Sequence, residues 1–391
     1  MEGKRKDLRF AIMLCLTVAL LLDVGILVVP LVRQEYWIWR LEAAHEKGKR
    51  QAAGVLGRIG SGRSVSKLLD LHARGQLGED AIGAVTNACR LRPGGAIPVL
   101  VHAMERGERE LRESALVVVI LAGHSGEAAL PCLLAMAGDP KEPLRARAVH
   151  AIDACWSDEE KAHRFLLDCL KDPDKGVQYV AADCLVTKGR SVAEAFPILL
   201  EQILLHRKLK DSKSSHRDTW REIHYAARKD MAGLVRLFSH PDVTVRSEAA
   251  FMAGKVGPLS REATMALGGL VKDGDSGVRR NAIVALKSLG ASAEPALPWL
   301  VEAIRGEDVD LACQAIEAAG ALGSAGKAAV PFLGDSLRSK QSIIRLNAAR
   351  VLGGIGPDAK AAAPRLKEHL DDTDEEVRKA AKEALAKVEG S

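Results

Sequence analysis

Apolar positions in the second half of the chain recur with a period of 33 residues. Within one period they fall at helical spacing twice, which predicts two helices separated by a turn. In the clearest period the first helix carries Ala282, Ile283, Leu286 and Leu289, and the second carries Leu300, Val301 and Ile304. Because one hairpin cannot bury its own apolar face, a fixed period of this size predicts hairpins stacked side by side.

Four positions keep the same residue type from one period to the next. The arginines are Arg246, Arg279, Arg345 and Arg378. The alanines are Ala249, Ala282, Ala315, Ala348 and Ala381. The glycines are Gly257, Gly290, Gly323 and Gly356, and the prolines are Pro298, Pro331 and Pro364. We expect alanine where two helices approach closely, glycine at the left-handed end of the first helix, and proline in the first turn of the second.

An acidic residue stands four positions before most of these arginines. The acids are Asp242, Asp275, Asp374 and, in an earlier period, Glu108. Asp308 keeps the position although its arginine is replaced by Ala312. We interpret the acid as the cap of the first helix and as the partner of the arginine, within or between repeats. A charge ladder for a ligand is the alternative, but recurrence in nearly every unit favours the structural role.

The pattern VRxxAxxALxxLG…PxL resembles short HEAT-type repeats of the phycobilisome-lyase-like kind, over roughly 45–388. It lacks the TPLH signature of ankyrin repeats and the W…LG…Y pattern of tetratricopeptide repeats. The resemblance implies an all-α fold, a right-handed α-solenoid of about ten helical-hairpin repeats that serves as a protein-binding scaffold. We expect the solenoid to end in a capping helix over 372–388, which begins with acids and ends with lysines, in agreement with the helix dipole.

The first 44 residues differ from the rest of the chain. Residues 1–9 form a basic tail, and residues 10–32 contain one charge, Asp23, among fifteen Leu, Ile, Val and Phe residues. As a helix this run would span about 35 Å, which exceeds the bilayer core of about 30 Å. Its apolar residues outweigh the cost of Asp23, on the order of 3 kcal/mol. The sequence predicts a single-pass transmembrane signal anchor over 10–32 and a juxtamembrane segment over 33–44.

Further features bear on the anchor and its orientation. Tyr36, Trp37 and Trp39 follow the apolar run, as in the aromatic belts of membrane interfaces. A cleaved signal peptide is the competing interpretation, but no small-x-small cleavage site follows the run. Asp23 is either a contact with a partner helix or a tolerated polar residue. The basic tail places the repeats on the extracytoplasmic side, although basic residues after the span weaken this bias.

One unit departs from the repeat through its polar residues. We assign the solenoid to 45–391 and its irregular unit to 204–238. Counting back from Arg246 places His216 in the alanine position and His224 in the glycine position. The candidate partner-binding residues of this unit are Arg217, Trp220, Arg221 and His224. A solvated loop followed by a helix in shifted register is the simpler interpretation, because charge runs are usually solvated.

A metal- or anion-binding site in 206–230, in an accessory protein or an enzyme, is the alternative function. His216, Asp218 and His224 would be the metal ligands, but no two of the histidines have the i, i+4 spacing of a helical site. The seven cysteines contain no CxxC pair, which argues against a zinc site and against a disulfide framework. We therefore expect no metal ligand and no cofactor.

The sequence carries no motif of a known catalytic centre. GxGxxG, GxxxxGK[ST], GxSxG and HExxH are absent. The deoxyhypusine hydroxylases, HEAT-repeat iron enzymes, use several His-Glu pairs, whereas this chain has one, His45-Glu46. A net charge of +5 over 391 residues predicts no nucleic-acid binding, and 4% aromatic residues argue against a small-molecule pocket. We predict a non-catalytic, membrane-anchored scaffold that binds an unidentified protein through the face lined by the second helices.

Overall fold

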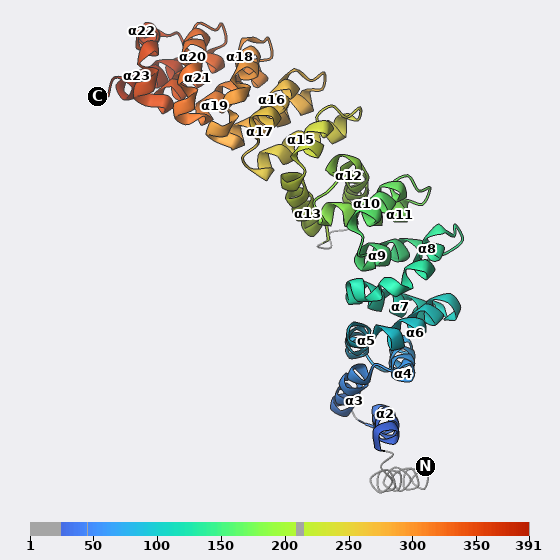
Figure 1. Ribbon diagram of the computed structural model, residues 1–391. Coiled ribbons are helices and arrows are strands. Elements are labelled where there is room, and N and C mark those ends of the chain that lie inside the picture. Colours follow the sequence, from blue (N-terminus) through green and yellow to red (C-terminus); the bar gives the residue numbers. More distant parts are fainter. Residues whose placement is uncertain (1–24, 45, 209–214, 391) are drawn as a thin grey trace. The chain divides into compact units, whose positions relative to one another are not determined.

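The computed structural model describes the backbone of residues 25–44, 46–208 and 215–390. Within these ranges, the side chains of 25–30, 205–208, 215–220 and 324 lie outside the description. Every regular element of the described residues is a helix. The chain forms two compact units, unit 1 (residues 1–184) and unit 2 (residues 185–391). Figure 1 labels most of their α-helices.

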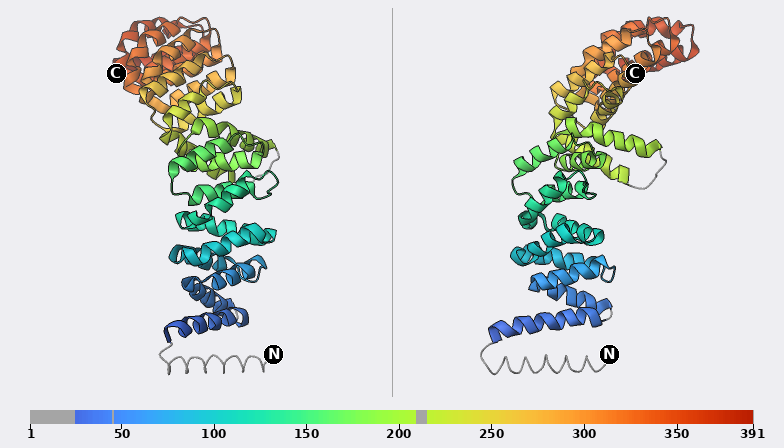
Figure 2. Two further views of the ribbon diagram at one scale, coloured as in Figure 1. Left: turned by 45° about the vertical axis from the view of Figure 1, so that its right-hand side comes forward. Right: turned by 90° about the vertical axis from the view of Figure 1, so that its right-hand side faces the viewer.

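Unit 1 is a stack of helical hairpins in two rows (Figures 1 and 2). Its helices are α2 (Gly25–Ala43), α3 (Glu46–Ile59), α4 (Gly62–Ala73), α5 (Glu79–Leu91), α6 (Pro93–Arg106), α7 (Arg109–Ala122), η1 (Gly123–Ala129), α8 (Leu130–Gly138), α9 (Arg145–Cys155), α10 (Glu159–Cys169) and α11 (Lys175–Thr187), which crosses into unit 2. The first helices α3, α5, α7 and α9 pack side by side in one row. The second helices α4, α6 and α8 form the other row, and α2 packs against α3 and α4 at its start.

Unit 2 repeats the same two rows. Its helices are α12 (Val192–Lys208), α13 (Ser215–Lys229), α14 (Met231–Leu237), α15 (Val243–Val256), α16 (Arg261–Gly269), η2 (Leu270–Lys272), α17 (Ser276–Leu289), η3 (Gly290–Ala296), α18 (Leu297–Arg305), α19 (Val309–Ala321), η4 (Gly323–Ala329), α20 (Val330–Ser336), α21 (Ser342–Ile355), η5 (Gly356–Ala362), α22 (Ala363–Glu368), η6 (His369–Asp371) and α23 (Glu375–Glu389). The odd-numbered helices α13 to α23 pack in sequence along one row. Helices α14, α16, α18 and α20 pack along the other.

The recurring residues have the roles expected from the sequence. The fully buried alanines are Ala249, Ala282, Ala315, Ala348 and Ala381. The glycines that follow the first helices have positive φ, from +57° at Gly290 to +103° at Gly257. The prolines in the first turn of α18, α20 and α22 are Pro298, Pro331 and Pro364. The predicted helical hairpin is therefore confirmed.

The recurring acid and the recurring arginine do not bind each other as one pair. The acids that cap their first helices by accepting backbone N–H groups, as predicted, are Asp242, Asp275, Asp308 and Asp374. Glu108, predicted to do the same for α7, makes no such hydrogen bond. Arg246 and Arg345 instead bind a different acid, in the next repeat. Arg246 binds Asp273 with Nε–Oδ2 and Nη2–Oδ1 distances of 2.7 and 3.0 Å. Arg345 binds Asp372 in the same way, at 2.8 and 2.7 Å. In these two pairs the capping acid and the pairing acid are separate residues.

Each pairing acid stands two residues before a capping acid and has several partners. Asp273 accepts the backbone N–H of Asp275 at 2.9 Å, in addition to the guanidinium of Arg246. The same guanidinium donates to the His240 carbonyl of its own repeat at 2.8 Å. The hydrogen bonds from Arg246 hold the pKa of Asp273 below its usual value. The ionised pair therefore connects the loops of neighbouring repeats.

Arg279 lacks such a pairing acid, because Gly306 stands 27 residues later, at the position of the acid in the other pairs. The carboxylate of Asp308 lies 3.8 Å away. Gly306 has an extended backbone (φ −71°, ψ 171°), which other residues also adopt. Gly306→Asp is expected to raise the free energy of unfolding of unit 2 by about 1 kcal/mol, through a new ion pair and a less flexible unfolded chain. Denaturant unfolding of Gly306→Asp and Gly306→Ala tests this, since equal stabilities would show that no ion pair forms.

The predicted transmembrane segment lies mostly outside the described residues. Residues 25–32 form the start of α2, and residues 33–43 continue the same helix. Among the described residues, one helical stretch is long and apolar enough to cross a membrane, Arg109–Gly138. It consists of α7, η1 and α8, and Ala115, Val119 and Leu133 within it are fully buried. Its apolar character is accounted for by the core of the stack.

Candidate functional site

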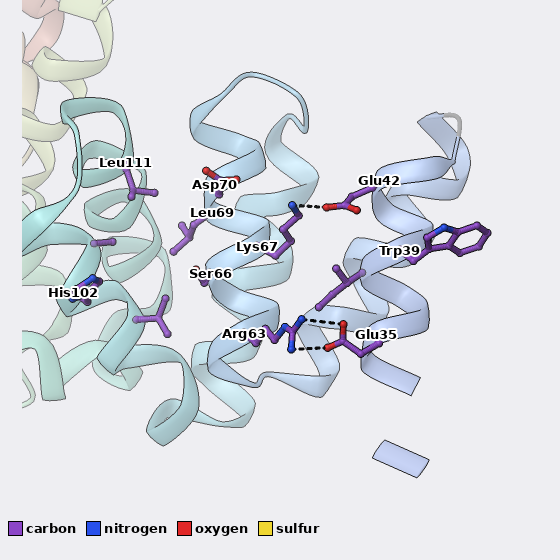
Figure 3. Close-up of a pocket in the computed structure, with 13 residues that line it drawn as sticks. Glu35, Trp39, Glu42, Arg63, Ser66, Lys67, Leu69, Asp70, His102 and Leu111 are labelled. Carbon is purple, nitrogen blue, oxygen red and sulfur yellow. Dashed lines mark hydrogen bonds and ion pairs between the residues drawn. The ribbon is translucent and has the colours of Figure 1, made fainter. Parts of the chain in front are cut away.

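A groove of about 750 Å³ lies along the second-helix row of unit 1, and we call it the inner groove. Its lining residues are Glu35, Ile38, Trp39, Glu42, Arg63, Ser66, Lys67, Leu69, Asp70, Val99, His102, Ala103 and Leu111. They come from α2, α4, α6 and the start of α7. Figure 3 shows α4 between α2 on one side and α6 with α7 on the other.

The α2 wall of the groove is fixed by contacts with the turn that precedes α4. Ser61 caps α4 by accepting the backbone N–H of Ser64 at 3.2 Å. Its hydroxyl donates to Gln34 Oε1 at 2.8 Å, which satisfies an amide that is only 6% exposed. Two turns of α2 later, Leu41 is fully buried against the stack, at 1% exposure. α2 is therefore part of the folded unit, held by a buried amide and a buried leucine.

Two ion pairs join α2 to α4 across the groove. Arg63 donates to Glu35, with Nη1–Oε1 and Nη2–Oε2 distances of 3.1 Å each. Lys67 Nζ lies 2.5 Å from Glu42 Oε1. Both acids point toward α4 and both bases toward α2, as Figure 3 shows. Because the pairs advance in the same direction along both helices, α2 runs parallel to α4.

The groove combines an apolar floor with a charged rim. Ile38, Leu69, Val99 and Leu111 supply apolar surface between the charged side chains. The rim carboxylate Asp70 is itself bound to Arg74, with an Nη2–Oδ1 distance of 2.9 Å. An apolar centre surrounded by polar groups is the usual composition of a protein-binding surface. Across the described part of the chain, no group of three or more His, Cys, Asp or Glu side chains could hold a metal ion.

Comparison with known proteins identifies the repeats. A sequence profile described as HEAT repeats matches residues 97–186, 231–312 and 297–386, well over half of the chain. The chain belongs to the HEAT-repeat family. No curated protein matches it. Among solved structures, three engineered proteins are similar to it: the first at 20% identity over 91% of this chain and 98% of its own, with a TM-score of 0.35. The second has 22% identity over 58% and 96%, with a TM-score of 0.34, and the third 21% over 59% and 99%, with 0.36.

The residues predicted to bind a partner lie in α13, the first helix of the irregular HEAT unit, and none of them lines the inner groove. Arg217 and Trp220 belong to α13 by their backbone, and their side chains lie outside the described residues. Arg221 is exposed and His224, one turn later, is half-buried. Burial, together with nearby Arg228 and Lys255, lowers the pKa of His224. The proposed triad of His216, Asp218 and His224 also lies partly outside the described side chains.

The register predicted for this irregular HEAT unit is wrong. His224 was placed at the glycine that ends the first helix, but α13 continues to Lys229 and buries Ala226 and Ala227. Asp230 then accepts the N–H groups of Gly233 at 2.8 Å and of Val192 at 2.9 Å, so one carboxylate caps α14 and binds the start of α12. An acid therefore replaces the usual glycine turn, and counting by 33 residues from the next repeat could not reveal it.

Sequence reasoning also missed the groove residues on α2, because residues 33–44 were assigned to a juxtamembrane segment. The sequence nevertheless contained a pattern that indicates this packed face. Gln34, Ile38 and Leu41 follow helical spacing and form one face, with Glu35 and Glu42 beside it. That face is the one that packs against α3 and α4.

Proposed function

We propose that this HEAT-repeat protein is a membrane-anchored, non-catalytic scaffold that binds a protein partner in the inner groove. The repeats form a right-handed solenoid of about ten hairpins, residues 10–32 anchor it as a single-pass helix, and the repeats lie on the extracytoplasmic side. The observation that carries the proposal is the groove itself, an apolar floor with a charged rim on the second-helix row. HEAT repeats present such rows as extended binding surfaces.

The ion pairs of the rim support recognition of a folded or helical segment. Lys67 and Glu42 are 29% and 50% exposed, so both remain accessible while they bind each other. A partner with charged side chains flanking an apolar stripe would meet matching charges on both walls. The apolar floor would contribute most of the binding free energy, because exposed rim charges contribute little.

Blocking the groove tests this function. Ser66 is exposed on α4 and lines the groove, so Ser66→Trp fills it without disturbing the core. Full-length protein is purified from membranes with crosslinked partners, and the captured proteins are compared by mass spectrometry. We expect Ser66→Trp to reduce capture of the specific partner about tenfold or more, as a clash at an interface centre does.

Asn87→Trp provides the matched control, because Asn87 is exposed on α5, in the first-helix row. Its capture should equal that of the unmodified protein. Equal capture by all three proteins would rule out the inner groove as the binding site. Recovery of the protein in the aqueous fraction instead of the membrane fraction would rule out the anchor.

A further inference from the structure

The first-to-second-helix turns of unit 1 form a continuous edge, which we call the turn edge. Glu35 of α2 binds Arg63 at the start of α4 at 3.1 Å. A Cβ placed on Gly60, in the α3–α4 turn, would lie 3.2 Å from the Cβ of Arg92, in the α5–α6 turn. Arg90 Nη2 in turn donates to the Leu121 carbonyl, at the end of α7, at 2.6 Å. The middle of α2, at Glu35, and the next three hairpins therefore share this edge.

Large apolar side chains are exposed at this edge. Leu91, the last residue of α5, is 58% exposed, and Leu121, in the last turn of α7, is 48% exposed. Leu31, in the part of α2 that extends past the α3–α4 turn, is 61% exposed. In the described part of unit 1 the one other large apolar side chain with comparable exposure is Leu134, at 37%. Exposed apolar side chains gathered along one edge indicate a surface that contacts something apolar.

The α3–α4 and α5–α6 turns of the turn edge are basic, whereas Glu35 of α2 pairs with Arg63 and Glu127 lies in the α7–α8 turn. The segments 58–63 and 90–95 contain four arginines and no acid. On the opposite edge, the segments 72–80 and 104–110 contain five acids and three arginines. Leucines interspersed with arginines are the side chains that contact the headgroup layer of a bilayer, where arginine binds phosphate and leucine enters the acyl boundary.

The direction of α2 places this edge relative to the predicted anchor. α2 runs parallel to α4, and its N-terminal end, which continues from residues 10–24, emerges at the turn edge. Gln34, which binds the α3–α4 turn, follows the end of the predicted span at Val32 by two residues, or about 3 Å of helix. The headgroup layer on each side of a bilayer is about 5–7 Å thick. The α3–α4 turn would therefore lie at headgroup depth.

We infer that the turn edge of unit 1 contacts an anionic lipid surface. The helix axes of unit 1 would then be perpendicular to the membrane plane, and α2 would continue into the bilayer. This rests on the anchor of the proposed function. The outward face of α2 agrees with it: the Trp39 indole points away from α4 in Figure 3, and the Arg40 guanidinium lies 5.4 Å from the Trp37 ring centroid. In this orientation the inner groove faces sideways and stays open to a partner.

Photocrosslinking to lipid tests the contact. Full-length protein is reconstituted in vesicles of phosphatidylcholine and phosphatidylglycerol, with photoreactive benzoylphenylalanine in place of Leu91. The control carries it in place of Gln76, which is exposed at the opposite edge. After illumination, mass spectrometry of the peptides measures the lipid adducts. We expect the adduct yield at position 91 to exceed that at 76 about fivefold or more, and to fall about as much when Arg58→Glu and Arg92→Glu are introduced together.

Arg106→Glu, at the opposite edge, is the charge-matched control and should leave the yield at position 91 unchanged. Equal yields at positions 91 and 76, in protein that floats with the vesicles, would overturn the contact and leave the anchor intact. A yield at position 91 that is insensitive to the Arg58→Glu and Arg92→Glu changes would overturn the role of anionic lipid. Protein that does not float with the vesicles would overturn the anchor and, with it, this inference.

Discussion

Asp372→Ala is expected to lower the free energy of unfolding at the C-terminal end of unit 2 by about 2–4 kcal/mol. The Asp372 side chain is 5% exposed and binds Arg345, itself 12% exposed, through two hydrogen bonds. Removing the carboxylate leaves a guanidinium that is largely shielded from water without its charge partner. Arg345 keeps its hydrogen bond to the Ser339 carbonyl at 2.9 Å, so the loss is smaller than for a fully buried pair.

The effect of Asp372→Ala should depend on pH in a defined direction. The hydrogen bonds from Arg345 hold the pKa of Asp372 well below its usual value. A carboxylate with a lowered pKa in the folded state stabilises the protein above the pKa of the unfolded chain, about 3.9. The difference in the free energy of unfolding between the variant and the unmodified protein should therefore be largest at neutral pH and decrease as the pH falls below about 4.

Denaturant unfolding, with hydrogen exchange of α21 and α23 as a local readout, measures this difference. Repeats contact only their neighbours, so exchange should rise near the C-terminal end more than in α15. Asp371→Ala is the control, because Asp371 is exposed next to the pair and should change stability by less than about 0.5 kcal/mol. A loss for Asp372→Ala no larger than that of the control would disprove the role of the inter-repeat pair.

The second large effect is expected at two adjacent glycines of α21 that should respond in opposite directions. A Cβ on Gly353 would lie 2.8 Å from Cα and 3.0 Å from Cβ of Ala384 in α23, whereas one on Gly354 would have no atom within 4 Å. Gly353→Ala should therefore destabilise the unit by about 1–3 kcal/mol, because the two helices must move apart. Gly354→Ala should stabilise it by about 0.5–1 kcal/mol, because alanine is the better helix former.

Thermal or denaturant unfolding measures the change in stability of each variant. The two variants can be compared directly, because both replace a glycine of the same helix by alanine and add the same volume. Destabilisation by both, or stabilisation by both, would contradict the contact between α21 and α23. Gly254 provides an independent test in the same unit, because a Cβ there would lie 2.8 Å from Cα of Ala285. Gly254→Ala should therefore resemble Gly353→Ala.

The candidate site was predicted less well than the fold, for a physical reason. Arg217, Trp220, Arg221 and His224 were selected because their unit breaks the repeat, and that break lies at the end of α13, at Lys229, and in the cap at Asp230. The inner groove uses residues that are ordinary in sequence. Arg63 and Glu35 lie 28 positions apart and form a wall only because α2 packs parallel to α4. A one-dimensional pattern carries no information on which charged side chains will face each other across such a gap.

Sequence alone was enough to predict the features that depend on neighbours within one hairpin: the helix spacing, the capping acids, the glycine turns and the prolines at Pro298 and Pro331. Each follows from backbone conformation and local hydrogen bonding, which act over a few residues. Tertiary structure alone decided that Arg246 binds Asp273 rather than the acid four residues before it, that α2 belongs to the stack, and where α13 ends. Each of these results depends on contacts between residues that are far apart in the chain. Only the packing of the helices determines which of those residues come within reach of one another.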